Sequence, residues 1–256
     1  MNEIRGVIRP YHRICRQFVD GRYTEGGRWQ YITHPKYADS PHQFVNAFNL
    51  LQKDLLELFD YIEPADRNLM CYSYRIQELL LRTCIEIESN FKAIFSENLY
   101  QNKRNMNMTH DYRKIDISHR LSSYQVKLPY WQGVKQIRTP FSYWATAQPL
   151  KWYQDYNATK HNRHKSFERA SFSSLIEAMC GLVVVLSAQF HTEDFSPREP
   201  YLALEGYGDG LDSAIGGYFR VKFPEDWPED ERYAFDWQEL KNLSDPFDRF
   251  DYRLLN

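Results

Sequence analysis

Residues 152–167, WYQDYNATKHNRHKSF, hold the densest group of side chains suited to polar chemistry in this chain. Two imidazoles, an amide and several cations fall within one short stretch. On a helix, positions i, i+3, i+4 and i+7 share one face. Here these positions are Asn157, Lys160, His161 and His164. Tyr153 joins the same face one turn earlier.

Such a face suits an RNA phosphodiester. Cleavage by the 2′-hydroxyl group of the RNA needs a base for the hydroxyl proton and an acid for the leaving oxygen. A histidine can do either near neutral pH, and a Lys or Arg can stabilise charge that develops on the phosphate. The catalytic candidates are therefore Asn157, Lys160, His161 and Arg163. The substrate-binding candidates are Tyr153, Tyr156, His164 and Lys165. The alternative is an ordinary solvated basic helix face.

The sequence gives little support for a metal site. Asp155 is the carboxylate beside this face, and hard cations prefer several oxygen ligands. The four cysteines form no CxxC pair, and no histidine spacing completes a zinc site. We expect no metal and no cofactor.

The start of the chain lacks the apolar region of a signal peptide. The longest apolar run, 175–190, contains Glu177 and is short for a membrane span. We therefore expect a cytoplasmic protein that does not associate with a membrane.

Charge is distributed unevenly along the chain. Residues 97–170 hold 13 Lys and Arg against 5 Asp and Glu, a net charge of +8. Residues 193–256 hold 7 against 16, a net charge of −9. A basic middle indicates an anionic partner such as nucleic acid. The alternative is that the acidic tail folds over the basic middle.

Apolar residues recur at three- and four-residue steps in two long segments, which predicts helices at about 43–62 and 68–98. A third helix should run from Pro149 to about 163. A fourth should begin near 171–174, with Ser174 and Glu177 as a capping box, and continue through an apolar run to about 191. Because the fourth helix is apolar all round, we place it at the centre of a bundle.

The fold class is therefore mainly α, a helical bundle with additions at both ends. Residues 1–42 should form an irregular arm, with one strand at 28–33. Residues 43–192 should form the bundle, with a long basic insertion at about 99–147 that holds a short strand or helix at 121–128. Residues 193–256 should form an acidic extension with short strands at 201–207, 217–223 and 232–237.

The stretch YNATKHNRH, together with the order of elements, resembles the HEPN superfamily of helical-bundle proteins. That family is prominent in bacterial toxin–antitoxin and phage-defence systems, and its motif is R-x(4–6)-H with a polar residue after the Arg. Asn157 and His161 match the polar residue and the His, whereas Tyr156 occupies the position of the Arg. Tyr cannot supply a permanent cation. The resemblance covers about 43–192, and segment 74–94 also resembles an early helix of such proteins.

The resemblance implies a metal-independent endoribonuclease that acts as a homodimer, with the two motifs facing each other and with an antitoxin or another defence protein as a partner. Tyr156 favours a second hypothesis, a non-catalytic HEPN-like module that binds RNA, a nucleotide or a protein. A third hypothesis is an assembly protein whose basic middle binds the acidic tail of a neighbour.

Overall fold

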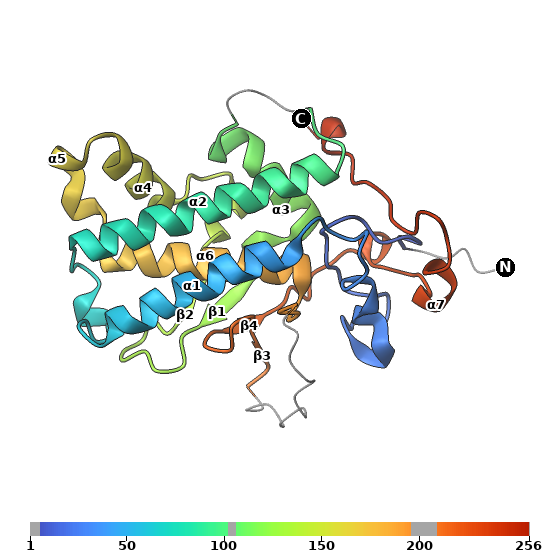
Figure 1. Ribbon diagram of the computed structural model, residues 1–256, viewed down its shortest axis with the longest axis horizontal. Coiled ribbons are helices and arrows are strands. Elements are labelled where there is room, and N and C mark those ends of the chain that lie inside the picture. Colours follow the sequence, from blue (N-terminus) through green and yellow to red (C-terminus); the bar gives the residue numbers. More distant parts are fainter. Residues whose placement is uncertain (1–5, 102–105, 196–208, 256) are drawn as a thin grey trace.

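The computed structural model describes residues 6–101, 106–195 and 209–255. The fold is mainly helical, with a small antiparallel sheet against one side of the bundle (Figure 1). The long helices are α1 (Pro41–Phe59), α2 (Tyr74–Glu97), α4 (Lys151–His161) and α6 (Phe172–Phe190). The short ones are α3 (Lys114–His119), α5 (Arg163–Ser166) and α7 (Trp237–Leu240).

Helix α6 forms the centre of the bundle, as its composition predicts. It packs against α1, α2 and α4, and every residue from 178 to 190 is buried. By length and composition α6 could cross a membrane, but 89% of its apolar window is buried inside the protein. Its N-cap is Ser171, whose side chain accepts a hydrogen bond from the Ser174 amide, so the predicted capping box at Ser174 is wrong.

Helices α1 and α2 confirm the two helices that the spacing of apolar residues predicted. The predicted apolar positions of α2 are buried, and Ser73 caps the helix by accepting a hydrogen bond from the Ile76 amide. The helix begins at Tyr74, later than predicted, because residues 66–68 form a separate 3₁₀ turn. Figure 1 shows the start of α2 at the same end of the bundle as α4 and α5.

The sheet joins the basic insertion to the C-terminal extension. Its order is β2 (Ile137–Arg138), β1 (Gln125–Lys127), β4 (Arg220–Lys222) and β3 (Asp212–Ser213). Val126 pairs with Val221, and both are fully buried. The strand predicted at 217–223 is confirmed as β4. Segment 232–237 makes isolated bridges through Tyr233 instead of a strand, and segment 201–207 lies outside the described residues.

The N-terminal segment packs into the core that the bundle and the extension also share. The Tyr37 hydroxyl donates to the Gln189 carbonyl in α6 at 2.6 Å, and the Tyr233 hydroxyl donates to the Ile14 carbonyl at 2.7 Å. The strand expected at 28–33 is wrong, because Glu25–Tyr31 forms a 3₁₀ helix. The division into arm, bundle and extension stays a prediction.

Part of the acidic extension covers part of the basic middle within the same chain. Arg120 pairs with Asp226 at 3.4 Å, and Lys127 pairs with Asp209 at 3.1 Å. These contacts lie in the insertion and the sheet. The cations at the end of α4 and in α5 have no such partner among the residues that the structure describes.

Candidate functional site

Helix α4 is held to the bundle by its apolar side. Trp152 is 4% exposed, and its indole N–H donates to the Pro140 carbonyl at 2.9 Å. Thr159 is also buried, and its hydroxyl donates to backbone carbonyls of the preceding turn. The helix is therefore fixed along most of its length.

Asp155 ties α4 to the start of α6. Its carboxylate is 1% exposed and accepts hydrogen bonds from Lys151 at 2.6 Å, Arg169 at 2.9 Å and Ser174 at 2.7 Å. A buried carboxylate needs such partners to offset the loss of hydration. Asp155 therefore positions the helix and is not free to bind an ion.

The two tyrosines expected to bind substrate face the bundle. Tyr156 is fully buried, and Tyr153 donates its hydroxyl hydrogen to Glu88 of α2 at 2.8 Å. Burial, and then the charge of Glu88, raise the pKa of both phenols, so both stay neutral. Lys160 donates to the Tyr156 hydroxyl at 3.0 Å. Tyr156 thus anchors Lys160 and presents no surface to a ligand.

The predicted continuous face is interrupted after His161. Asn162 has φ −144° and ψ 61°, which is not helical, and α5 begins at Arg163. The helix was predicted to reach about Arg163, so this boundary is corrected to His161. Asn157, Lys160 and His161 remain together on α4. His164 lies on α5 and leaves that face.

The break produces an exposed basic corner, which we call the α4–α5 corner and define by His161, Arg163, His164 and Lys165. All four side chains are exposed. The side chains of His161, His164 and Lys165 form no hydrogen bond or ion pair with any described residue. These groups are therefore available to an anionic ligand.

Two exposed aromatic rings lie beside the α4–α5 corner. Tyr74 is 67% exposed, and the guanidinium of Arg163 lies 5.6 Å from its ring centre. Tyr72 is 52% exposed, and both rings contact Phe167, at 5.4 Å for Tyr72 and 4.7 Å for Tyr74. Tyr72 lies just before α2 and Tyr74 is the first residue of α2, so both are far from the corner in sequence. The sequence did not predict these two tyrosines as site residues, because their neighbours in sequence do not indicate that they contact Arg163 and Phe167.

Asn157 lies partly exposed and lines a cavity together with Tyr153 and His110. The side-chain amide of Asn157 makes no hydrogen bond with any described residue. Four of the predicted site residues therefore lie at the α4–α5 corner, Asn157 and Tyr153 line the neighbouring cavity, and Tyr156 and Lys160 bind each other.

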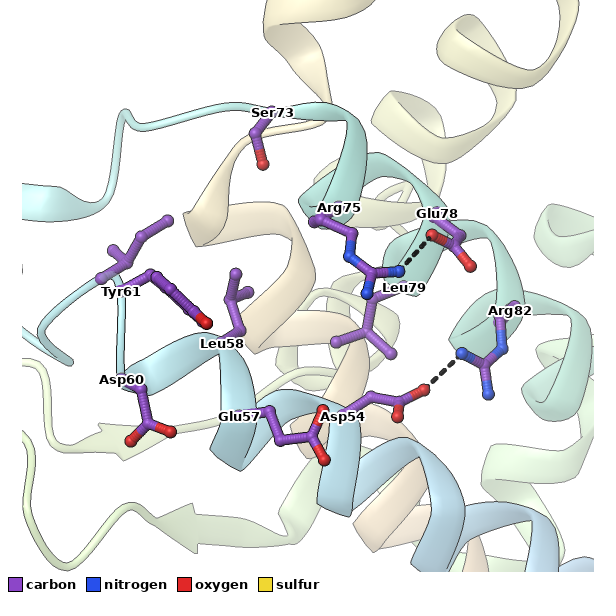
Figure 2. Close-up of a pocket in the computed structure, with 11 residues that line it drawn as sticks. Asp54, Glu57, Leu58, Asp60, Tyr61, Ser73, Arg75, Glu78, Leu79 and Arg82 are labelled. Atoms are coloured by element: carbon purple, nitrogen blue, oxygen red, sulfur yellow. Dashed lines mark hydrogen bonds and ion pairs between the residues drawn. The ribbon is translucent and has the colours of Figure 1, made fainter.

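A second cavity of about 600 Å³ lies between α1 and α2 (Figure 2). Its floor includes Leu58 and Leu79, and Figure 2 shows charged side chains around them, with Arg75 paired to Glu78 and Arg82 paired to Asp54. Two more carboxylates, Glu57 and Asp60, line it. This excess of negative charge makes the cavity a poor site for a phosphate.

The described residues include no group of three or more His, Cys, Asp or Glu side chains placed to hold a metal ion. Cys15, Cys84 and Cys180 are buried, and burial raises the pKa of each thiol, to about 12 for Cys15. They therefore stay protonated, as small core residues do.

Comparison of the chain with protein-family models, with curated proteins and with solved structures gave no match.

Proposed function

We propose that this protein binds RNA at the α4–α5 corner and cleaves it without a metal ion, in the manner of an HEPN-like ribonuclease. The observation that carries the proposal is one surface that combines exposed rings of Tyr72 and Tyr74 with exposed cations and imidazoles. These cations and imidazoles form no ion pair with any described residue. Cations bind phosphates, and exposed rings stack on unpaired bases. Described residues of the acidic extension pair with cations elsewhere, at Arg120 and Lys127, and none of them pairs with a cation of this corner.

Cleavage would follow the chemistry of the 2′-hydroxyl group. One imidazole takes the 2′-hydroxyl proton while the oxygen bonds to phosphorus, and the bond from phosphorus to the 5′-oxygen breaks. A protonated imidazole gives its proton to that leaving oxygen, and the products are a 2′,3′-cyclic phosphate and a 5′-hydroxyl end. His161 and His164 are exposed and can exchange protons, while Arg163 and Lys165 can stabilise the phosphate charge.

We further propose that two copies associate with their corners facing each other, as the HEPN resemblance implies. One copy offers His161 and His164 on separate helices, and a second copy would double the number of imidazoles and cations around one phosphate. Sedimentation with and without RNA measures this association. A partner protein from a toxin–antitoxin or defence system belongs to the same proposal.

The experiment is an RNA-cleavage assay in EDTA that detects fragments with 2′,3′-cyclic phosphate ends. Wild type should produce them, and His161→Ala should not. His42→Ala is a matched control, because His42 is an exposed histidine of α1, outside the corner. Equal cleavage by wild type and His161→Ala would exclude His161 from the chemistry.

The second candidate is a non-catalytic HEPN-like module that binds RNA, a nucleotide or a protein. The burial of Tyr156 favours it, because a neutral ring fills the position where the family has its cation, and because this ring holds Lys160. In that case RNA binding at the corner persists while wild type yields no cyclic phosphate.

A further inference from the structure

A cavity of about 520 Å³ lies between α4 and the segment 106–110, next to the α4–α5 corner. Cavities of this size in proteins commonly hold small ligands. Its lining includes Leu150, which is the N-cap of α4, and Gln154 and Asn157 from α4 itself. Trp144 comes from the 3₁₀ helix Ser142–Thr146 that precedes α4. All the residues that line this cavity belong to the part of the chain that the structure describes.

The floor of the cavity is apolar and fixed. Leu150 is 2% exposed, Met108 is 5% exposed and Trp144 is 4% exposed. The Trp144 ring lies 4.7 Å from the Phe141 ring, and Tyr153 is held by its bond to Glu88. A preformed apolar floor of this kind suits the face of a flat ring, because burial of that face needs no rearrangement.

The rim of the cavity is polar and is formed by the side chains of Thr109, His110, Gln154 and Asn157. None of these four side chains makes a hydrogen bond with any described residue. The lining includes no carboxylate, Lys or Arg. Groups that both donate and accept, without a fixed charge, match the edge of a nucleobase better than a phosphate.

The cavity and the α4–α5 corner lie next to each other along α4, since Asn157 lines the cavity and His161 belongs to the corner. Asn157 precedes His161 by one turn of α4, a rise of about 6 Å along the helix. We infer that the cavity binds one nucleobase of the RNA whose backbone crosses the α4–α5 corner. This inference rests on the proposed function and adds a base preference to it. The base lies on the apolar floor, and the amides of Gln154 and Asn157 bind its edge.

Calorimetric titration of the full chain with AMP, GMP, CMP and UMP tests this inference, with ribose 5-phosphate as the control for phosphate alone. At least one nucleotide should bind saturably, with a preference among the four bases, and ribose 5-phosphate should not. Asn157→Leu and Gln154→Leu should each weaken that binding about tenfold, as expected for lost amide hydrogen bonds. Asn46→Leu makes the same change at an exposed position of α1 and should leave binding intact.

The inference is overturned if none of the four nucleotides binds, if ribose 5-phosphate binds equally well, or if both cavity variants bind like wild type. A melting curve for each variant shows that it is folded. Salt-dependent binding of a longer RNA tests the proposed function separately. RNA binding without mononucleotide binding overturns the base cavity alone. Mononucleotide binding without RNA binding overturns the proposed function, and with it the assignment of the base to an RNA.

Discussion

The ammonium group of Lys160 lies 3.0 Å from the phenolic oxygen of Tyr156, one turn earlier in α4, and 5.1 Å from the centre of that ring. Tyr156 is fully buried. Tyr156, which the resemblance to the HEPN superfamily would align with the family's Arg, therefore belongs to the core of this protein, and its hydroxyl fixes a neighbouring cation.

Tyr156→Arg tests this arrangement. A guanidinium at a fully buried position, beside Lys160, should lower the free energy of unfolding by about 3 kcal/mol or more, since desolvation and like-charge repulsion both oppose it. Tyr156→Phe removes the hydroxyl alone and should cost about 1 kcal/mol. Urea unfolding measures both. Wild-type stability for Tyr156→Arg would mean that Glu88 accepts the new cation.

Val183→Asp tests the role of α6 as the central helix. Val183 is 2% exposed, so a carboxylate there is buried without a partner and should cost about 3 kcal/mol or more. Ile85→Asp is the matched control, because Ile85 is 52% exposed on α2 and the change there should cost less than about 1 kcal/mol. Equal melting temperatures for the two variants would contradict the buried position of α6.

Asp155→Asn tests how α4 is fixed. The amide keeps the shape but loses the charge that Lys151 and Arg169 share, and it presents one acceptor oxygen instead of two. We expect a loss of about 1–3 kcal/mol, moderated by the exposure of both cations. Asp54→Asn, in the exposed pair with Arg82, should cost less than about 1 kcal/mol. Denaturant unfolding that ranks the two variants in the opposite order would argue against this anchor.

His119 should make stability depend on pH. Burial, opposed by a hydrogen bond to the Arg13 carbonyl at 2.9 Å, lowers the pKa of His119 from 6.5 to about 3. Between these pH values His119 is protonated in the unfolded chain but neutral in the folded protein. The free energy of unfolding therefore falls as the pH decreases from 6.5 toward 3. The loss from this residue between pH 7 and pH 5 is about 2 kcal/mol. His191, whose burial lowers its pKa to about 4, acts in the same direction.

The measurement is urea unfolding at pH 7 and pH 5. His119→Gln is less stable at pH 7 but should lose less on acidification than wild type. His42→Gln, at an exposed position of α1, should keep the wild-type dependence. A steeper dependence in His119→Gln would contradict a neutral buried imidazole.

The sequence predicted the four long helices because each has apolar positions at helical spacing or is apolar throughout. It could not predict contacts between distant residues. Ser171 caps α6 in place of Ser174, whose hydroxyl is taken by Asp155 from α4. Residues 28–33 carry strand-forming side chains, yet adjacent Tyr31 and Ile32 are both buried. Their burial against distant rings such as Tyr37 and Tyr233 overrides the local preference.

The candidate site was predictable only in part, for the same reason. Helical spacing correctly placed Asn157, Lys160 and His161 on one helix. The end of α4 at His161 could not be predicted, because no Gly or Pro stands near Asn162 in the sequence. The burial of Tyr156 and the approach of Tyr72 and Tyr74 depend on how α2 packs beside α4, and helical spacing carries no information about that packing.

Central to this account is RNA binding by the cations of the α4–α5 corner. Its most direct measurement is fluorescence anisotropy of a labelled single-stranded RNA with increasing salt. The compared proteins are wild type and the double variant Arg163→Ala/Lys165→Ala. Lys53→Ala/Lys92→Ala is the matched control, because both lysines are exposed on other helices.

Wild-type affinity should fall steeply between about 50 and 200 mM salt, because bound cations release counterions from RNA. The corner variant should bind more weakly at every salt concentration, and its slope of log affinity against log salt should be shallower by about 1.4, or 0.7 for each of two lost phosphate contacts. The control should match wild type. Wild-type affinity and slope in the corner variant, or no binding of RNA by wild type, would contradict the account.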